Sequence, residues 1–326
     1  MSIKDQIDTF SNTKVLVIGD IMLDTYIHGT VHRMSPEAPV PVVSEERRNF
    51  CLGGAANVAL NLKSLGADTH IISVIGKDDK GNQIKTLLAD ANINAELLED
   101  LKRPTTSKVR ILNDDIQALR VDNESDDYVN DQISDRILTS LKSLIDLDLV
   151  ILQDYDKGVF SKTLIERIIT HCKTNNIFVA VDPKKRHFKD YTQVDLFKPN
   201  LREIEEGLSI QFNTSIETEI KAAVDQLNAL IKSKYTLLTL ADKGIYIKED
   251  EGVLVPTFQL GVSDVSGAGD TVISVAALAL KNGLSIKETA KISNLAASIV
   301  CQEIGVVPID KAALIAQLSR LDELDS

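Results

Sequence analysis

The chain has 326 residues, of which 44% are hydrophobic and 26% are charged, and its formal net charge is −12. This balance is ordinary for a globular protein and gives enough chain for one large domain or two modest ones. The acidic charge argues against nucleic acid or an anionic membrane as the main partner, although a small anionic substrate needs only local positive charge. The absence of tryptophan and the aromatic content of 4% also argue against base-stacking platforms for nucleic acid.

The three cysteines, Cys51, Cys172 and Cys301, are far apart and form no CxxC pair. This usage is typical of the reducing cytosol and predicts neither a disulfide framework nor a zinc site. The N-terminal residues lack the long apolar segment of a signal peptide, and no window approaches 18 uninterrupted apolar residues. We therefore expect a cytoplasmic protein with no membrane partner.

The first ten residues predict a short helix or a loose arm. The apolar run 14–20 follows and predicts a strand buried on both faces, as in parallel sheets. Polar residues at the carboxyl ends of such strands line ligand crevices in open α/β folds. Asp20 and Asp24 are therefore candidate site residues, with loop capping as the alternative.

Two segments differ from the rest of the chain because they alternate and have no helical period. Residues 26–48 carry three prolines and predict short exposed strands and turns that project from the main body. Within them, His28 and His32 have metal-ligand spacing, but no third ligand is near and a helix is disfavoured. Residues 105–121 have the same character, with a turn at 113–115. Together the two segments predict a small sheet over the mouth of a crevice, a lid that excludes water.

Gly53 and Gly54 open a predicted helix that runs to Leu62 and closes at Gly66. The two glycines allow a ligand to approach the backbone closely. Asn57 lies on the first turn, where an amide can both donate to and accept from a sugar hydroxyl. Tight helix packing is the alternative explanation for these small residues.

Strands and helices then alternate, which is typical of a mostly parallel α/β sheet. The predicted strands are 70–75, 149–152, 178–181, 196–198 and 235–240, and the predicted helices are 80–91, 131–144, 161–174, 217–232, 285–302 and 310–321. Four successive strands are followed by polar groups, in the stretches Asp154 to Gly158, Asp182 to Lys184, Asn200 to Glu203 and Asp242 to Gly244. This recurrence predicts an active site at one edge of the sheet.

The stretch 264–271 lies between a β-like segment, 252–260, and an apolar helix, 271–280. Ser266 is a plausible N-cap of that helix. Gly267 and Gly269 permit close backbone approach, and the free N–H groups of the first turn attract an anion. Asp270 would then be a general base beside a phosphate cradle. The alternative is a small-residue turn with an acidic residue that favours the helix dipole.

These parts suit phosphoryl transfer, which needs a base, donors to the phosphoryl oxygens, magnesium and exclusion of water. Asn200 and Glu203 can hold water or Mg²⁺. Positive charge for an anionic substrate is available at Lys157, Lys184 and Arg110. No Walker A pattern, no GxGxxG after the first strand and no GxSxG elbow occur, which argues against P-loop, dinucleotide and hydrolase functions.

Three ordered motifs resemble those of the ribokinase-like carbohydrate kinases. Residues 53–57 and 264–270 resemble the two family signatures, and residues 200–203 resemble the N-x-x-E motif for magnesium and phosphate. The resemblance implies a three-layer α/β/α fold with a mostly parallel central sheet and a small β-sheet lid. It implies one kinase domain over residues 1–326, with lid segments at about 25–50 and 103–122.

Within that family, the chain resembles more closely the kinases of D-glycero-D-manno-heptose 7-phosphate. The supporting stretches are 19–24, 33–42, 154–158, 182–184 and 264–273, and the run Ser35 to Val42 is the most specific. The resemblance implies transfer from ATP, with Mg²⁺, to the anomeric hydroxyl, on the route to ADP-heptose and lipopolysaccharide core. A kinase for another sugar and an inactive sugar-binding protein are the alternatives; Asp270 argues against the latter.

The resemblance also implies a role for each matching residue. Asp270 is the base, Gly267, Ala268 and Gly269 form the anion hole, Asp20, Gly53, Gly54, Asn57 and Lys184 bind the sugar phosphate, and Asn200 and Glu203 serve the nucleotide and Mg²⁺. We add Asp24, Arg110 and Lys157 as candidates for the sugar phosphate, with Arg110, Lys157 and Lys184 as competing partners of its phosphate group. Further candidates for the nucleotide are Asp242, Gly244, Ser266 and Asn294. Such kinases often dimerise through their lids. No HxGH surrounds any of the five histidines, so we expect a separate nucleotidyltransferase. Ser266 stands where many relatives have threonine, and Arg202 is bulkier than expected within N-x-x-E.

Overall fold

The computed structural model describes residues 3–114, 116–258 and 261–324, with side chains described up to Leu321. Its larger sheet has nine strands in the order β13-β12-β11-β10-β9-β8-β1-β4-β5. The strands are β1 (Lys14–Gly19), β4 (Asp68–Gly76), β5 (Asn94–Asp100), β8 (Leu149–Gln153), β9 (Phe178–Asp182), β10 (Leu196–Phe197), β11 (Tyr235–Thr239), β12 (Ile245–Lys248) and β13 (Gly252–Val255). From β11 to β5 all neighbours are parallel, whereas β12 and β13 are antiparallel.

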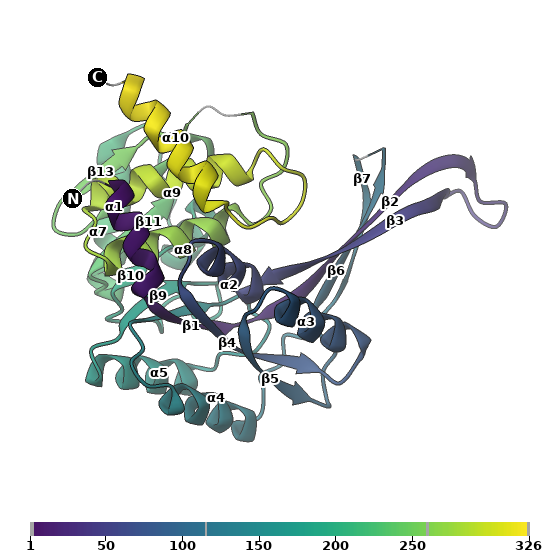
Figure 1. Ribbon diagram of the computed structural model, residues 1–326, viewed down its shortest axis with the longest axis horizontal. Helices are drawn as coiled ribbons and strands as arrows, with labels where there is room; N and C mark the ends of the chain where they lie inside the picture. The colour runs from purple at the N-terminus through teal and green to yellow at the C-terminus, as the bar shows by residue number, and fades with distance from the viewer. Residues whose placement is uncertain (1–2, 115, 259–260, 325–326) are drawn as a thin grey trace.

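Helices cover both faces of this sheet, which gives three layers (Figure 1). One face carries α1 (Ile3–Asp8), α2 (Ala55–Ser64), α3 (Asp79–Asp90), α8 (Ala268–Lys281), α9 (Ile286–Val300) and α10 (Lys311–Leu324). The other carries α4 (Asp131–Ser143), α5 (Lys162–Thr174), α6 (Leu201–Leu208) and α7 (Glu217–Ile231).

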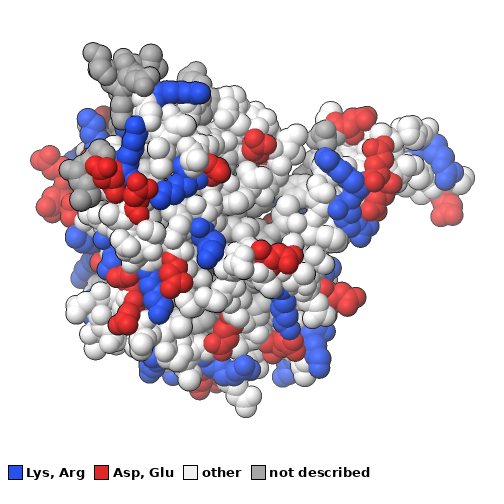
Figure 2. Space-filling model, in the orientation of Figure 1, with Lys and Arg blue, Asp and Glu red and all other residues white. Residues whose placement is uncertain are grey.

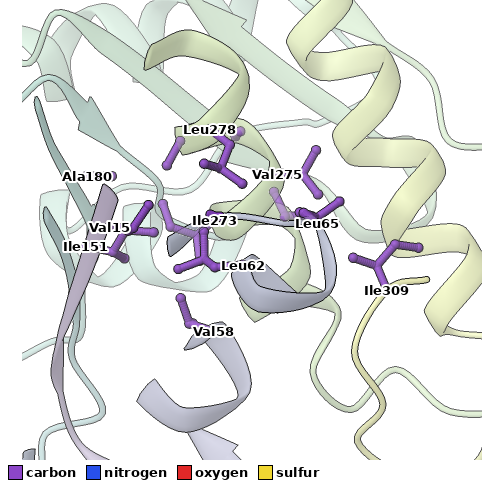
Figure 3. Packing of buried hydrophobic residues seen from close by; sticks show 14 of the residues in the cluster. Val15, Val58, Leu62, Leu65, Ile151, Ala180, Ile273, Val275, Leu278 and Ile309 are labelled. Atoms are coloured by element: carbon purple, nitrogen blue, oxygen red, sulfur yellow. The ribbon is translucent and has the colours of Figure 1, made fainter. Parts of the chain in front are cut away.

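The core is divided in two by the sheet because successive strand residues point to opposite faces. In β1, Val15 and Val17 belong to one buried cluster, and Leu16 and Ile18 belong to the other. Figure 3 shows the first cluster, where sheet residues such as Val15 lie with side chains from α2 and α8. A strand buried on both faces reads as a continuous apolar run, as predicted for residues 14–20.

The second sheet has four strands in the order β3-β2-β6-β7 and projects from the main body (Figure 1). Its strands are β2 (Ile21–Met34), β3 (Pro41–Gly54), β6 (Ser107–Asn113) and β7 (Ile116–Asn123). We call this sheet the arm. The prediction of short strands for residues 26–48 was wrong, because β2 and β3 have 14 residues each and pair along their length. The pairing shifts register between His28 and Gly29 and again between Val31 and Arg33.

The remaining differences from the sequence-based expectations are local. The helix after the glycine-rich loop begins at Ala268 with Gly267 as its N-cap and no side-chain cap bond, so the prediction of Ser266 as N-cap was wrong. Strands β5 and β12 were not predicted. The strand predicted over 252–260 ends at Val255, and residues 259 and 260, like residue 115 of the predicted turn, lie outside the described residues. None of the described helices is long and apolar enough to cross a membrane.

Candidate functional site

A cavity of about 1150 Å³ opens beyond the carboxyl ends of β9, β10 and β11. Residues predicted to bind the nucleotide or the transferred phosphate contribute to its lining, namely Asn200, Asp242, Gly244, Ala268, Gly269 and Asn294, together with Lys184. Apolar side chains such as Phe258 and Val262 complete it. A cavity with mixed apolar and convergent polar groups is the usual form of a small-molecule site.

Asp270 lies in the first turn of α8 and is buried, with 4% of its surface exposed. Its Oδ2 accepts a hydrogen bond from Asn57 Nδ2 at 2.8 Å. Its Oδ1 accepts from the Tyr155 hydroxyl at 2.7 Å and from Gln153 Nε2 at 3.0 Å. Burial raises the pKa of Asp270 to about 6, while the bonds from Asn57 and Tyr155 oppose that rise. A carboxylate with this pKa is a suitable general base near neutral pH.

Of the two glycines just before Asp270, Gly267 has a conformation and surroundings that require glycine. Gly267 has a φ of 83°, and a Cβ there would lie 2.8 Å from Asn57 Nδ2. A Cβ on Gly269 would lie 3.7 Å from Lys198 Nζ, so this ammonium stands beside the predicted anion hole. Lys198 is buried and its Nζ lies 3.0 Å from Asp182 Oδ2. Sequence reasoning missed Lys198, although a cation at the carboxyl end of the predicted strand 196–198 was a signal for it.

Asn200 and Glu203 form a capping box at the start of α6. Asn200 Oδ1 accepts from Glu203 N at 2.9 Å, and Glu203 Oε2 accepts from Asn200 N at 2.9 Å. The same N-x-x-E spacing is thus also a helix-start signal. The other oxygen of Glu203 pairs with Lys184. Burial would lower the pKa of Lys184, but Asp182 and Glu203 outweigh it and raise that pKa.

The carboxylate of Asp20 caps a loop, which was the alternative to a site role. It accepts hydrogen bonds from the backbone N–H groups of Tyr155 at 2.8 Å, Lys157 at 3.1 Å and Val159 at 3.3 Å. Asp20 is buried, and burial raises its pKa. It therefore fixes the loop after β8, from which Tyr155 reaches Asp270.

Asp24 lies farther along β2 and forms a partly buried ion pair with Arg110 of β6. Gly53 of β3 faces this pair, and a Cβ there would overlap Asp24 Oδ2. Gly54 has a φ of 59° and approaches the carbonyl of Asp20. These residues, on the predicted sugar side, do not line the large cavity on the predicted nucleotide side, but Lys184, which was also predicted to bind the sugar phosphate, does.

Asn57 connects these two sides. It lies in the first turn of α2, whose N-cap is Gly54, and its side-chain amide donates to Asp270 Oδ2. Lys157, which was predicted to bind the sugar phosphate, pairs with Glu124 near the base of the arm, with 2.7 Å between its Nζ and Glu124 Oε1.

Ser266, Asn294, Asp242 and Gly244 shape the rest of the site. Ser266 N donates to Asp264 Oδ1 at 2.9 Å, which fixes the turn before α8. Asn294 Nδ2 donates to the carbonyl of Val255 at 2.8 Å, and Asp242 and Gly244 lie in and after the 3-10 turn that follows β11. On the face drawn in Figure 2, basic and acidic side chains are interspersed over the body and the arm. That pattern is unlike the single basic face of a nucleic-acid-binding protein.

Comparisons with known proteins identify the family of the chain. The model of the pfkB family carbohydrate kinases matches residues 12–312. The chain is 37% identical over 293 residues to the bifunctional protein HldE of Campylobacter fetus, covering 89% of this chain and 63% of that protein. It is also 37% identical over 316 residues to HldE of Desulfatibacillum aliphaticivorans, covering 96% and 64%. The chain thus spans slightly less than two thirds of these relatives.

Solved structures share the fold at low sequence identity. Phosphofructokinase-2 from Escherichia coli, in complex with substrates and products, has a TM-score of 0.80 at 17% identity, covering 95% of this chain and 99% of that one. Ribokinase from Arabidopsis thaliana, complexed with ribose and ATP, has a TM-score of 0.72 at 19% identity, covering 93% and 98%. The architecture is therefore ribokinase-like, as predicted.

Proposed function

The chain belongs to the pfkB family of carbohydrate kinases, and from that premise we propose that it phosphorylates D-glycero-D-manno-heptose 7-phosphate. ATP would supply the phosphoryl group, the anomeric hydroxyl would receive it, and the product would be the 1,7-bisphosphate on the route to ADP-heptose and lipopolysaccharide core. The observation that carries the catalytic part is Asp270, a buried carboxylate at the helix N-terminus next to the large cavity. The resemblance of residues 19–24 and 33–42 to heptose 7-phosphate kinases supports the choice of sugar.

In this proposal, Asp270 removes the proton of the sugar hydroxyl. The N–H groups of residues 267–269 and the Lys198 ammonium stabilise the negative charge that spreads over the transferred phosphoryl group. Asp24 and Arg110, with Gly53 beside them, lie on the sugar side. The sugar phosphate is an anion, which Arg110 and Lys157 could attract locally despite the acidic net charge of the protein.

The oxygen-bearing side chains of Asn200 and Glu203 suit a magnesium ion that arrives with ATP. Among the described residues, no group of three or more histidine, cysteine, aspartate or glutamate side chains could hold a metal ion alone. Mg²⁺ commonly keeps several waters and is held by one or two carboxylates and the substrate phosphates. Glu203 stands beside the cavity-lining Asn200; because its two oxygens already pair with Asn200 N and Lys184, it could hold such an ion only through water at their remaining acceptor positions. When bound, the ion would neutralise charge on the phosphate oxygens.

We further propose that the chain is one kinase domain with the arm as its lid, and that two copies associate through their arms. The arm exposes large apolar side chains, with Ile116 73%, Leu119 55% and Val121 50% exposed on β7. Such apolar groups on a projecting sheet favour a protein partner. The three cysteines are free thiols, which suits the proposed cytoplasmic location.

A panel of sugar phosphates and free sugars, each with ATP and Mg²⁺, tests the function by release of ADP. We expect the heptose 7-phosphate to give the highest kcat/KM and excess EDTA to abolish turnover. Preference for another sugar would redirect the proposal within the family. Binding of sugar and nucleotide without ADP release would favour an inactive sugar-binding protein.

A further inference from the structure

The two oxygens of the Asp270 carboxylate have different surroundings. Oδ1 accepts two hydrogen bonds, from the Tyr155 hydroxyl and from Gln153 Nε2. Oδ2 accepts one, from Asn57 Nδ2. An ionised carboxylate has about four acceptor positions, two on each oxygen. The donors from the described residues therefore fill Oδ1 and leave one acceptor position on Oδ2.

We propose that Tyr155 is a positioning residue for Asp270: with Gln153 it occupies Oδ1, and it thereby leaves Oδ2 as the oxygen that meets the sugar hydroxyl. The inference rests on the proposed role of Asp270 as the base. It adds which carboxylate oxygen reacts and which side chain determines this.

The location of Tyr155 suits this role. Its backbone N–H donates to the buried Asp20 carboxylate at 2.8 Å, which fixes the loop after β8. The Lys184 ammonium lies 5.3 Å from the centre of its ring, and Lys184 pairs with Glu203 on the nucleotide side. Burial and the nearby Asp270 raise the pKa of the Tyr155 hydroxyl well above its usual value, so it remains a donor at any working pH. One side chain thus touches both the base and the cation beside the nucleotide cavity.

Several charged groups surround Asp270 and contribute to its proton affinity. The Asp182 carboxylate, at the end of β9, raises its pKa, and the Lys198 ammonium lowers it. Lys184 also interacts with it electrostatically. Because these charges would be unchanged in a Tyr155→Phe variant, the effect of that change isolates the hydroxyl.

The step balances without a further reagent. The sugar oxygen forms a bond to the γ-phosphorus, and the bond from that phosphorus to the bridging oxygen of ADP breaks, with its electron pair going to ADP. The hydroxyl proton goes to Asp270 Oδ2. If Oδ1 lost the Tyr155 donor, the carboxylate would hold a proton more strongly and both oxygens could turn toward the hydroxyl.

The test compares Tyr155→Phe with Tyr191→Phe. Tyr191 is a matched control because it is also buried and its hydroxyl also donates to a carboxylate at 2.7 Å, but that carboxylate is Asp154. Phenylalanine keeps the ring under Lys184. A hydrogen bond to a charged acceptor corresponds to about one pKa unit or more, so the acidic limb of kcat/KM should move up by about one pH unit in Tyr155→Phe. Activity at pH 6 should then fall about tenfold relative to pH 8, while Tyr191→Phe keeps the wild-type limb.

A carboxyl titration by NMR of the free protein gives a second measurement that needs no sugar. Asp270→Asn identifies the Asp270 signal, and that signal should titrate at higher pH in Tyr155→Phe. Should Tyr155→Phe fail to fold, Gln153→Met removes the other Oδ1 donor, together with its hydrogen bond to Asp182 Oδ2 at 3.1 Å, and should move the titration in the same direction. An unchanged acidic limb and titration, or an equal shift in Tyr191→Phe, would overturn the positioning role. If Asp270→Asn keeps full turnover while the Asp270 titration still shifts in Tyr155→Phe, the proposed base fails but the hydrogen bond to Oδ1 stands.

Discussion

Asp270→Asn should separate catalysis from stability. The substitution keeps the shape of the side chain and removes the charge and the base. Loss of a general base lowers turnover by roughly 10²–10⁴-fold. Nucleotide binding should persist because Asp270 does not line the large cavity. The new amide nitrogen cannot accept, so one of the three donors around Asp270 loses its partner, at a cost of about 1–3 kcal/mol.

The same variant should gain stability from the removed charge at high pH. The pKa of Asp270 rises from 3.8 to about 6 on folding, so the folded state binds its proton more tightly than the unfolded state. Ionisation of Asp270 therefore lowers the free energy of unfolding. The loss is zero well below pH 3.8, where the group is protonated in both states, and reaches about 3 kcal/mol above pH 6. Asparagine cannot ionise, so the variant avoids this loss of stability. At pH 8 the gain offsets the cost of the donor left without an acceptor, whereas at pH 4 there is almost no gain.

Denaturant unfolding of both proteins at pH 4, 6 and 8 measures this difference, and ADP release measures turnover. We expect the variant to become more stable relative to wild type by roughly 2 kcal/mol between pH 4 and pH 8. Titrations of the other groups cancel in the comparison. A stability difference that stays constant with pH would refute the raised pKa, and wild-type turnover would refute the role of Asp270 as base.

Three further changes address other parts of the site. Gly53→Ala should raise the KM for the sugar phosphate about tenfold or more and spare the KM for ATP, since its Cβ would overlap Asp24; equal effects on both would contradict the separation of the two sides. Lys198→Met should lower kcat by about 10²–10³, and kcat within threefold of wild type would remove Lys198 from the phosphate site. The variant should also unfold more easily, by up to about 3–5 kcal/mol, because the buried Asp182 carboxylate would keep only Gln153 and the more distant Lys184 as partners. Leu119→Asp should dissociate the proposed dimer in sedimentation runs, while Ile145→Asp, exposed on the main body, should not; a wild-type monomer would refute the arm interface.

Much of the fold was predictable because buried parallel strands and amphipathic helices have distinct periods. The helix predicted over 131–144 is α4, Asp131–Ser143. The lengths of β2 and β3 were not predictable, because the outer part of each strand is largely exposed and is ordered by pairing between the two strands rather than by an apolar run. Strand β5 was not predicted either, because its first three residues are exposed and it contains no long apolar run.

The site was predictable where a residue type or a motif implies its chemistry, and less so where partners come from elsewhere in the chain. Asp270 was singled out from its own loop. Its contact with Tyr155 joins residues 115 positions apart, and no local spacing indicates such a pairing. For Asp20, the position at the end of a buried strand was predicted, but its partners were not. Its carboxylate accepts hydrogen bonds from three backbone N–H groups that come together only in the folded loop after β8.

The hairpin of β2 and β3 is attached to the site at both of its ends. Asp24 lies near the start of β2, and Gly54 at the end of β3 leads directly into the helix of Asn57. The register shifts after His28 and after Val31 separate this inner half from the tip. Such bulges bend and twist a ribbon locally. The inner half of the hairpin therefore carries Asp24 on β2 and leads from β3 into the helix of Asn57, so the same part of the ribbon holds both residues, and the bulges separate it from the tip.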